Sequence, residues 1–434
     1  MRWLCQLPAL LIISALSLSS AGFAQSSPPA LKAITLDSNG VDLASGRLIV
    51  ANDDIQIGND DSNLTLRRSY SYQNKYYTTM PFGMNSSFSY YSLVSWDGST
   101  RMRFDIAGHA YRFTLSGTPG SGTATYANVY HDGAIVQDDL SCSRCIKLIT
   151  KDGAEHSFQL LYLLYNMNAG PVGAPTTFSE YPIRYIKYPN GNTLRYAYEV
   201  GDNSGWRARL TSVTNSYGYG MRFYYIDNGH GSYNPAQFTI NKVEAFNGAC
   251  SAPSPCVVRT ALYQYQQTPG FGSATSYNLT QFTDVNGGNT TYSYDTDGVF
   301  GRMISYTKPG GTTPYLAMSY TSDGAGGSAI GTLTDGTGAI THYQITVNYS
   351  PSSRYMTRIA PDGGTSVYQT VAFGDPYFYI DYFVSSKTNE LNYTWTNTFD
   401  TYGRITQIQD PQGGKIIETL DDRENVSNYS VVPH

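Results

Sequence analysis

The sequence of 434 residues has little charge and no clustered charge. Asp, Glu, Lys and Arg make up 14% of it, and the formal net charge is −5. Basic residues form no stripe or run. Nucleic acid is therefore not an expected partner, because neutralising phosphates needs clustered Lys and Arg. Ala, Leu and Glu, which favour helices, dominate no segment beyond the first two dozen residues, so a helical fold is not expected.

Motifs typical of enzymes and metal sites are missing as well. The six histidines are scattered, and neither an H-E-x-x-H nor a G-x-S-x-G motif occurs. The S-x-x-K match at Ser305–Lys308 falls in a predicted strand, where a helical nucleophile site cannot form. Asp295–Gly298 and Asn59–Asn63 could hold calcium through oxygen ligands, although Asp and Asn more simply form turns there. We expect no enzymatic activity and assign no catalytic, cofactor-binding or metal-binding residue.

The chain has only one long hydrophobic run, and it lies near the N-terminus. Leu7–Leu18 is an apolar run of 12 residues that follows Arg2, and small residues then precede Gln25. This pattern is typical of a secretory signal peptide, and the run is too short to span a bilayer. We expect residues 1–24 to be removed and Gln25–His434 to be exported through the Sec pathway. The mature protein would then be secreted, at the cell surface or in the periplasm.

Cysteine is also scarce, and four of the five cysteines follow the expected signal peptide. In an exported protein, the simplest interpretation is two local disulfides, Cys142–Cys145 and Cys250–Cys256. Cysteines three residues apart along an extended strand are too far apart to bond, so a turn at Ser143-Arg144 is predicted. Zinc binding is the alternative for the four cysteines. A redox role for C-S-R-C is another, although no helix start follows to lower a thiol pKa.

Tyrosine and glycine, in contrast, are abundant, with 39 and 42 copies. Tyr and β-branched residues suit a pleated, half-buried surface, and Asn-Gly or Asp-Gly pairs suit tight turns. Strict alternation, as in Leu64–Arg67, and regular turn signals such as Asp132-Gly133 predict strands from Leu31 to about Leu160. The Gly-, Pro- and Ala-rich stretch Asn166–Thr177 is the predicted domain boundary. The composition predicts an all-β protein.

After Tyr181 the chain repeats an aromatic strand, a polar turn and a second strand. The aromatic anchors are Tyr198, Tyr225, Tyr265, Tyr294, Tyr320, Tyr349, Phe373 and Phe399. Their spacing is regular apart from one longer gap, which contains Cys250–Cys256 and is predicted to be a clipped insertion. Such a period indicates an array in which each unit packs on its neighbours. Repeated hairpins give one long antiparallel sheet, which the right-handed twist of its strands coils into a curved wall.

Two copies of the repeat are clear. In the copy that begins at Phe399, Asp400 is expected to accept backbone hydrogen bonds, Gly403 to take a positive φ, and Arg404 to start the return strand. The following turn is built from Asp410, Pro411 and Gly413. The other copy begins at Tyr292, and its motif residues are Tyr292, Tyr294, Asp295, Gly298, Gly301 and Arg302.

These two copies resemble the YD repeat of the RHS family, which includes bacterial RHS proteins, insecticidal toxin-complex shells and teneurins. The N-terminal stretch resembles the region that opens many bacterial RHS proteins. The matching segments are G-x-L at Gly46–Leu48, L-x-L-x-R-x-Y at Leu64–Tyr70, and P-F-G-M-N from Pro81, in which the family's usual Trp is absent. The resemblance implies an N-terminal RHS-associated β region over residues 25–165 and about eight YD repeats over residues 178–434, the last degenerate.

The family implies a spiral of β-hairpins that forms a hollow shell, often around a C-terminal toxic polypeptide. Only 20 residues follow Gly414, so neither a closing core segment nor a toxin domain is expected here, and an open, curved shell is predicted. Together with the signal peptide and the missing enzyme motifs, the resemblance indicates an exported, non-enzymatic scaffold. One hypothesis makes it an incomplete or split part of a toxin-encapsulating shell, completed by a partner polypeptide or toxin cargo. The alternative is a carbohydrate-binding or adhesive cell-surface module, in which Trp96, Trp206 and Trp395 stack on sugar rings.

Overall fold

The computed structural model describes most of the chain after the first 35 residues. The described ranges are 36–72, 81–82, 84–90, 92–96, 100–106, 109–159, 162–164, 178–199, 209–227, 235–248, 256–269, 275–295, 301–323, 328–349, 352–373 and 381–433. In these ranges the elements are β-strands, apart from the short 3₁₀ turns η1 (Asp60–Ser62) and η2 (Pro235–Gln237). No helix in the described part of the chain has the length and hydrophobicity that a bilayer crossing requires.

The first four strands form a small antiparallel sheet, which we call the inner sheet. Its strands pair in chain order: β1 (Val41–Asp42), β2 (Arg47–Ile57), β3 (Leu64–Ser71) and β4 (Ser86–Phe88).

The next strands form two groups that meet at one long strand, β13 (Phe178–Lys187). The first half of β13 pairs with β5 and β12, and its second half pairs with β11 and β14. The strands leading to β13 are β5 (Ser92–Trp96), β6 (Arg101–Ile106), β7 (His109–Ser116), β8 (Thr125–Asn128), β9 (Ile135–Asp138), β10 (Cys145–Ile149), β11 (Glu155–Gln159) and β12 (Tyr162–Leu164).

From β13 onward, each strand pairs antiparallel with the next. These strands are β14 (Thr193–Glu199), β15 (Arg209–Asn215), β16 (Tyr219–Tyr225), β17 (Ile240–Asn247), β18 (Cys256–Pro269), β19 (Thr275–Thr283), β20 (Asn289–Tyr294), β21 (Met303–Thr307), β22 (Leu316–Ser322), β23 (Ser328–Asp335), β24 (Ile340–Tyr349), β25 (Ser352–Ile359), β26 (Thr365–Phe373), β27 (Asp381–Thr388), β28 (Thr394–Phe399), β29 (Ile405–Gln409), β30 (Lys415–Leu420) and β31 (Val426–Val432).

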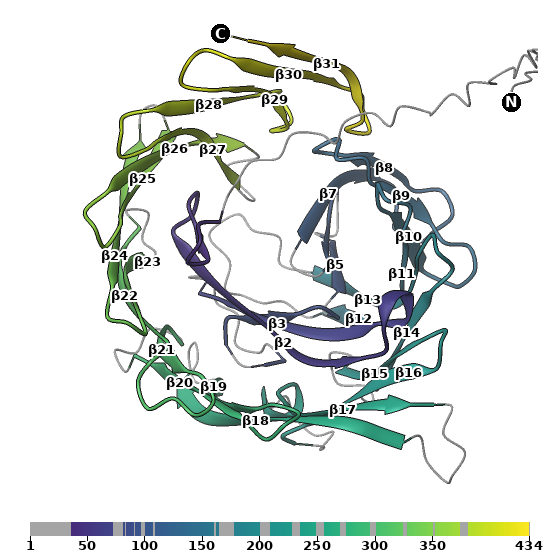
Figure 1. Cartoon of the computed structure of the whole chain (residues 1–434). Helices are drawn as coiled ribbons and strands as arrows, with labels where there is room; N and C mark the ends of the chain where they lie inside the picture. The colour runs from purple at the N-terminus through teal and green to yellow at the C-terminus, as the bar shows by residue number, and fades with distance from the viewer. Residues whose placement is uncertain are drawn as a thin grey trace, which may run out of the picture.

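Together with β9, β10 and β11, these strands make one antiparallel sheet of 22 strands, which we call the coiled sheet. Figure 1 shows it curving from β13 through β18 and β24 to β31. Among the described residues, no ladder joins β31 to a strand other than β30. The prediction of an all-β fold, built as a long antiparallel sheet that coils into an open, curved shell, is confirmed.

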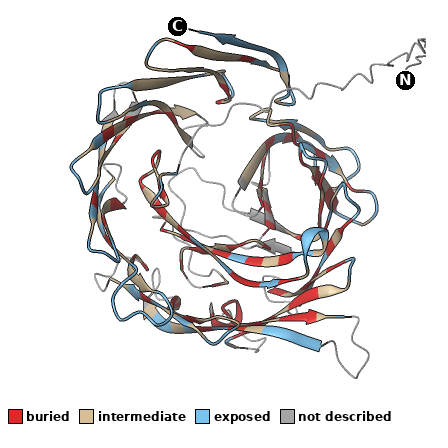
Figure 2. Cartoon of the chain, viewed as in Figure 1, coloured by how far each residue is buried: buried red, intermediate tan, exposed pale blue. Residues whose placement is uncertain are grey.

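The inner sheet lies inside the curve of the coiled sheet (Figure 1). Along β3, Leu64, Leu66, Arg68 and Tyr70 are all buried and alternate with more exposed residues. Period-2 alternation puts these four side chains on one face of the strand. They belong to one continuous core with apolar residues of the coiled sheet, which Figure 2 shows as buried segments facing each other across the two sheets.

A buried ion pair joins the inner sheet to the coiled sheet. Arg68 donates two hydrogen bonds to Asp54, at 2.8 and 3.1 Å, and a third at 2.9 Å to the hydroxyl of Tyr292 on β20. The Tyr263 hydroxyl, on β18, donates to Asp54 at 3.1 Å. Burial alone would lower the pKa of Arg68, but the charge of Asp54 raises it well above its ordinary value. Burial raises the pKa of Asp54 above its ordinary value, while the charge and hydrogen bonds of Arg68 act in the opposite direction. The buried Arg68 charge thus has a hydrogen-bonded partner, which a buried charge requires.

Backbone groups make further contacts between the two sheets. The Ile330 N–H donates to the Gly46 carbonyl at 2.9 Å. Gly46 has a φ of 72°, and a Cβ there would lie 2.8 Å from the Cβ of Ala329 and 3.0 Å from the Met356 side chain. Only glycine meets both constraints without strain. The Tyr70 hydroxyl donates to the Gly301 carbonyl and accepts from the Met303 N–H, both at 2.8 Å.

We expect Asp54→Ala to lower the free energy of unfolding by about 3–5 kcal/mol, because it leaves the Arg68 charge buried without its partner. Asp53→Ala is the matched control, since Asp53 pairs with Arg67 at 3.6 Å on the surface, with both side chains more than half exposed. Such a pair contributes about 0–1 kcal/mol. Denaturant unfolding of both variants measures the difference, and equal losses would contradict the role given to the buried pair.

His156, on β11, is a second buried titratable group. Its register partners are Leu148 on β10 and Ile186 on β13, both buried. Burial lowers the pKa of His156 from 6.5 to about 4, with a smaller opposing effect of Asp152. The unfolded chain therefore binds a proton in a pH range where the folded protein does not. Stability from this group is complete above about pH 6.5 and is lost as the pH falls toward 4.

We expect the wild-type protein to lose about 3 kcal/mol more stability than His156→Leu between pH 7 and pH 4, from 1.36 kcal/mol per pKa unit. Parallel unfolding titrations of the two proteins test this. The carboxylates contribute to acid destabilisation in both proteins, so the diagnostic quantity is the difference between the two slopes. Identical slopes would mean that His156 is not buried in the neutral form.

Candidate functional site

The turn of the clearest repeat copy is held by its aspartate. The Asp400 carboxylate accepts hydrogen bonds from the N–H groups of Tyr402 and Arg404, at 2.9 and 3.0 Å, and from the Arg404 side chain at 2.7 Å. Gly403 has a φ of 83°. The next turn is similar, because Asp410 accepts from the N–H of Gly414 at 2.8 Å and Gly413 has a φ of 98°. Asp400 and Asp410 thus stabilise hairpin turns, and their carboxylates already accept hydrogen bonds within these turns.

In the other copy, the repeat residues contact the inner sheet. Asp295 forms an ion pair with Arg302, and the Gly301 carbonyl accepts from Tyr70. The ring of Tyr294 lies edge-on to Tyr70 at 6.4 Å, and the Tyr292 hydroxyl accepts from Arg68. Gly298 lies outside the described residues.

A further regularity, which the sequence analysis missed, links consecutive hairpins. The anchor tyrosines Tyr225, Tyr265 and Tyr320 each donate a hydroxyl hydrogen bond to a carbonyl of the preceding hairpin, at 2.6, 2.6 and 2.8 Å. An arginine before that carbonyl lies over the same ring in two cases, Arg209 over Tyr225 and Arg302 over Tyr320. The available signal in the sequence was an acidic residue followed by an arginine across the turn, as in Glu199 and Arg209 or Asp295 and Arg302. The repeat residues thus stabilise the packing of consecutive hairpins in the coiled sheet.

Burial of the coiled sheet fades toward its C-terminal end. The main core ends at Val384 on β27. Next to it, Phe373, Phe383 and Phe399, from β26, β27 and β28, form a small aromatic group with ring centroids 5.4–6.0 Å apart. On β31, every residue after Val426 is exposed, and Figure 2 shows this strand as mostly exposed.

The free edge of β31 is the candidate interaction site. One side of β31 pairs with β30, and within the described chain no strand pairs with the other side. In an antiparallel strand, alternate N–H and C=O groups point to each side, so an edge strand offers a row of groups for another strand. Tyr429, Val431 and Val432 are 43%, 61% and 44% exposed there. Both hydrogen-bonding capacity and apolar surface are therefore available at this edge.

Turns next to β31 fix its position. The Lys151 ammonium donates to the Glu424 carbonyl at 2.6 Å. Arg404 donates to the carbonyls of His131 and Asp421, at 3.1 and 2.7 Å, and the rings of His131 and Tyr402 stack at 3.9 Å. These contacts tie the end of the coil to the turns beside β9 and β10, so the edge of β31 is held in a defined place.

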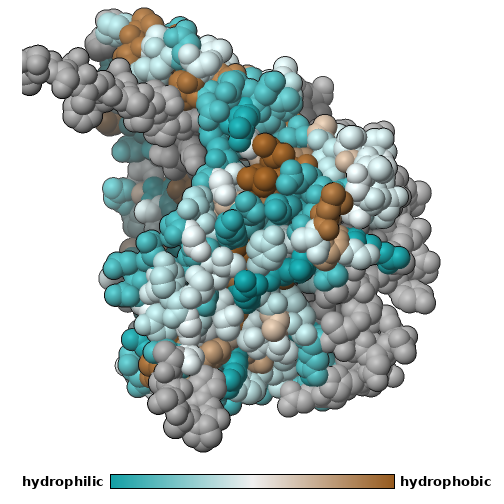
Figure 3. All heavy atoms as spheres, turned by 90° about the vertical axis from the view of Figure 1, so that its right-hand side faces the viewer, coloured by the Kyte–Doolittle hydropathy of each residue, from teal (hydrophilic) through white to brown (hydrophobic). Residues whose placement is uncertain are grey.

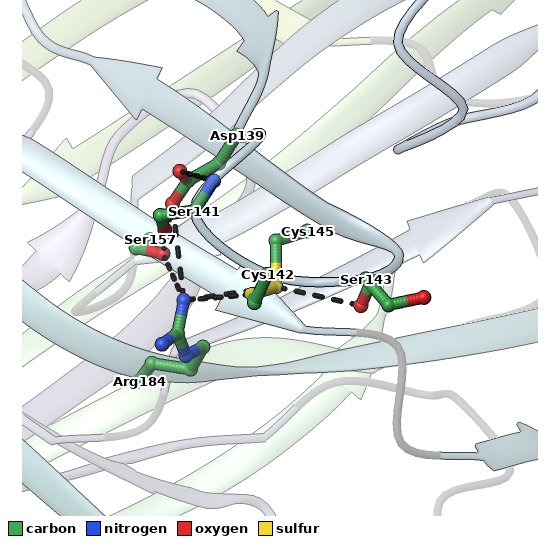
Figure 4. The surroundings of a disulfide bond; sticks show 7 residues. All are labelled: Asp139, Ser141, Cys142, Ser143, Cys145, Ser157 and Arg184. Atoms are coloured by element: carbon green, nitrogen blue, oxygen red, sulfur yellow. Dashed lines mark hydrogen bonds and ion pairs between the residues drawn. A yellow bond between two sulfur atoms is a disulfide. The ribbon is translucent and has the colours of Figure 1, made fainter.

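The first cysteine pair lies across a tight turn. Cys142 and Cys145 are placed as a disulfide, with their Cα atoms 5.6 Å apart (Figure 4). Ser143 and Arg144 form the turn between them, and Arg144 has a φ of 58°. Cys256 starts β18 in a disulfide-bonded form, while Cys250 lies outside the described residues. Both pairings stay predictions until free thiols are counted in the protein.

The residues considered for sugar or metal binding are scattered. Trp96 is partly buried and packs against the core, and Trp395 is partly exposed on β28, with the Lys387 ammonium 5.8 Å from its ring. Trp206 lies outside the described residues. Asn59 caps η1 through hydrogen bonds with Ser62. In the described ranges, no group of three or more His, Cys, Asp or Glu side chains could hold a metal ion. Glycan binding remains a hypothesis.

Comparison with known proteins finds resemblance only among solved structures. No protein-family model and no curated protein matches the sequence. A chain of the Photorhabdus luminescens Tc holotoxin pore is 10% identical with a TM-score of 0.38, over 94% of this chain and 24% of that chain. A TcdB2-TccC3-Cdc42 structure is 8% identical with a TM-score of 0.38, over 90% of this chain and 29% of that chain.

The N-terminal domain of the effector protein SpvB from Salmonella typhimurium is 12% identical with a TM-score of 0.31, over 60% of this chain and 98% of that domain. This chain spans less than a third of the toxin-complex chains that it matches. Identities and TM-scores this low carry no argument about function.

We expect Tyr320→Phe to destabilise the protein by about 1–2 kcal/mol, because the Met303 carbonyl loses its hydroxyl donor in a partly buried place. The control is Tyr315→Phe, since Tyr315 is 47% exposed and a surface change of this kind stays within about 0.5 kcal/mol. Unfolding midpoints of the two variants give the comparison. If Tyr315→Phe lowers the free energy of unfolding as much as Tyr320→Phe, the hydrogen bond from the tyrosine hydroxyl to the preceding hairpin does not explain the repeated tyrosines.

Proposed function

We propose that this protein is an exported, non-enzymatic RHS-type scaffold that binds an extended segment of a partner polypeptide along β31. The observation that carries the proposal is the unpaired edge of β31, with its exposed apolar side chains, at the end of a sheet in which each strand from β13 onward pairs with the next. Strand addition to such an edge is a common mode of peptide recognition, in which backbone hydrogen bonds supply much of the affinity.

The chemistry of β31 indicates what the partner segment should look like. The strand alternates, so Ser427, Tyr429 and Val431 share one face, while Asn428, Ser430 and Val432 share the other. Cross-strand pairs with aromatic or β-branched residues stabilise sheets. The segment should therefore be about five to seven residues long, extended, and rich in β-branched or aromatic residues opposite Tyr429 and Val431.

In the described part of the chain, the last strands of the coiled sheet are not covered by the inner sheet. Residues just before the inner sheet contact the coiled sheet as far as β24 and β25, where Asn39 donates to the Tyr343 hydroxyl at 2.9 Å and Asp37 pairs with Arg358 at 3.3 Å. A partner bound along β31 would continue the coiled sheet past its last strand. The RHS resemblance suggests that this partner completes a toxin-associated shell or carries the cargo itself.

The test is co-purification of the mature protein from its native host with flanking genes intact, followed by hydrogen exchange of the complex. We expect one polypeptide to co-purify and to slow exchange of the β31 amides at least about tenfold. Val431→Lys should abolish binding, because a charge on the edge opposes strand addition.

Leu262→Lys is the matched control, because Leu262 is 43% exposed on β18 and has register partners on both β17 and β19. It should leave binding unchanged. Recovery of the wild-type chain alone, or equal loss in both variants, contradicts the proposal. A dimer that Val431→Lys dissolves, seen by sedimentation, would replace the partner by a second copy of this chain.

A further inference from the structure

The two sulfur atoms of the C-S-R-C turn differ in exposure and in their surroundings. Cys145 is fully buried, whereas Cys142 is partly exposed. The guanidinium of Arg184, on β13, lies 2.8 Å from Cys142 Sγ and 3.6 Å from Cys145 Sγ. Figure 4 shows Arg184 pointing toward the disulfide. An external thiol can thus approach Cys142 but not Cys145.

Arg184 supplies a positive charge at the position where no helix start follows the C-S-R-C segment. A disulfide sulfur is a weak hydrogen-bond acceptor, but a thiolate is a strong partner for a guanidinium. A neighbouring Arg stabilises a thiolate much as a helix N-terminus does. The guanidinium beside Cys142 Sγ is therefore placed to favour the reduced, ionised form of this sulfur.

The other charges near the turn leave this effect in place. Asp139 lies 3.8 Å from Arg184 and accepts from Ser157 at 2.8 Å and from the N–H of Ser141 at 3.1 Å. Burial alone would raise the pKa of Asp139, but these hydrogen bonds lower it, so its charge is already well satisfied. Lys147 is paired with Glu155 at 3.1 Å. Arg144, exposed in the turn itself, adds a further positive charge.

We propose that Cys142–Cys145 is a thiol–disulfide exchange site that reacts with an external dithiol reductant at Cys142. The reductant's thiolate attacks Cys142 Sγ, a mixed disulfide forms, and the Cys142–Cys145 bond breaks. Its electron pair stays on Cys145 Sγ, which takes a proton from solvent. The second thiol of the reductant then attacks the mixed disulfide and releases the Cys142 thiolate beside Arg184. Overall, the protein gains two electrons and the dithiol becomes a disulfide.

Reduction of the disulfide would also affect the loop that contains Gly120 and Gly122, because this loop packs directly on the Cys142–Cys145 turn. A Cβ at Gly120 would lie 2.7 Å from the carbonyl carbon of Arg144, so the loop backbone contacts the turn backbone. Asp138 holds this loop through the N–H groups of Gly120 and Gly122, at 2.8 and 2.6 Å. The loop leads into β8, which forms no ladder with β9 in the described residues. This side of the molecule, seen face-on in Figure 3, is largely hydrophilic with separate hydrophobic groups.

The first experiment traps the mixed disulfide in the full mature protein. Cys145→Ser, incubated with glutathione disulfide, should form a glutathione adduct that peptide mapping assigns to Cys142. Cys142→Ser should form no adduct at Cys145, because that residue is buried. Equal adduct formation at both positions, or at neither, would overturn the assignment of Cys142 as the attacked sulfur.

The second experiment tests Arg184. In the wild-type background, Arg184→Gln should raise the dithiothreitol concentration needed for half reduction about tenfold, the effect of one pKa unit. In Cys145→Ser, it should move the pH midpoint of Cys142 alkylation by iodoacetamide up toward the free-thiol value of about 8.5. A merely structural role would not move that midpoint.

Arg195→Gln is the matched control, because this substitution removes the same charge from an exposed position on β14, the strand paired with β13. It should change neither readout. Equal shifts in the two variants would show that net charge, rather than contact with the sulfur, sets the reactivity. An unchanged alkylation midpoint in Arg184→Gln would overturn the proposal even if that variant were less stable.

Discussion

The structure depends on the buried contact between the inner sheet and the coiled sheet, with the Arg68–Asp54 pair at its centre. A sheet that coils has a concave face rich in aromatic rings, and that face must be shielded from water. The inner sheet supplies the cover, and the ion pair sets its register, because both charges find all their partners in one arrangement only. A slip by one residue would turn Arg68 to the opposite face of β3.

This arrangement divides the wall into a covered and an uncovered part. From β15 to β27 the concave face contributes to the main core, and contacts with the inner sheet and the residues just before it extend to β24 and β25. Beyond β27 the strands rely on hairpin turns and a small aromatic group, and β31 is largely exposed. Because of the same division, the repeat residues stabilise the coiled sheet, while the free edge of β31 is available for interaction.

The sequence predicted strands, turns and curvature well because these are local properties. The Asp400 turn, the positive φ of Gly403 and the turn between Cys142 and Cys145 follow from residues within four positions of each other. It did not predict that L-x-L-x-R-x-Y faces the repeats, since Arg68 and Tyr292 are 224 residues apart. Nor did it indicate Arg184 beside Cys142, 42 residues away, because strand pairing alone brings them together.

By itself, the sequence determined that the chain is an all-β repeat protein, since period-2 alternation and turn chemistry act over a few residues and need no distant partner. Only the tertiary structure decided what fills the curve of the coil, where burial ends, and which sulfur is exposed. These features come from contacts between strands far apart in the chain. Their geometry is set by how the sheet twists and curves around the inner sheet, which no local pattern encodes.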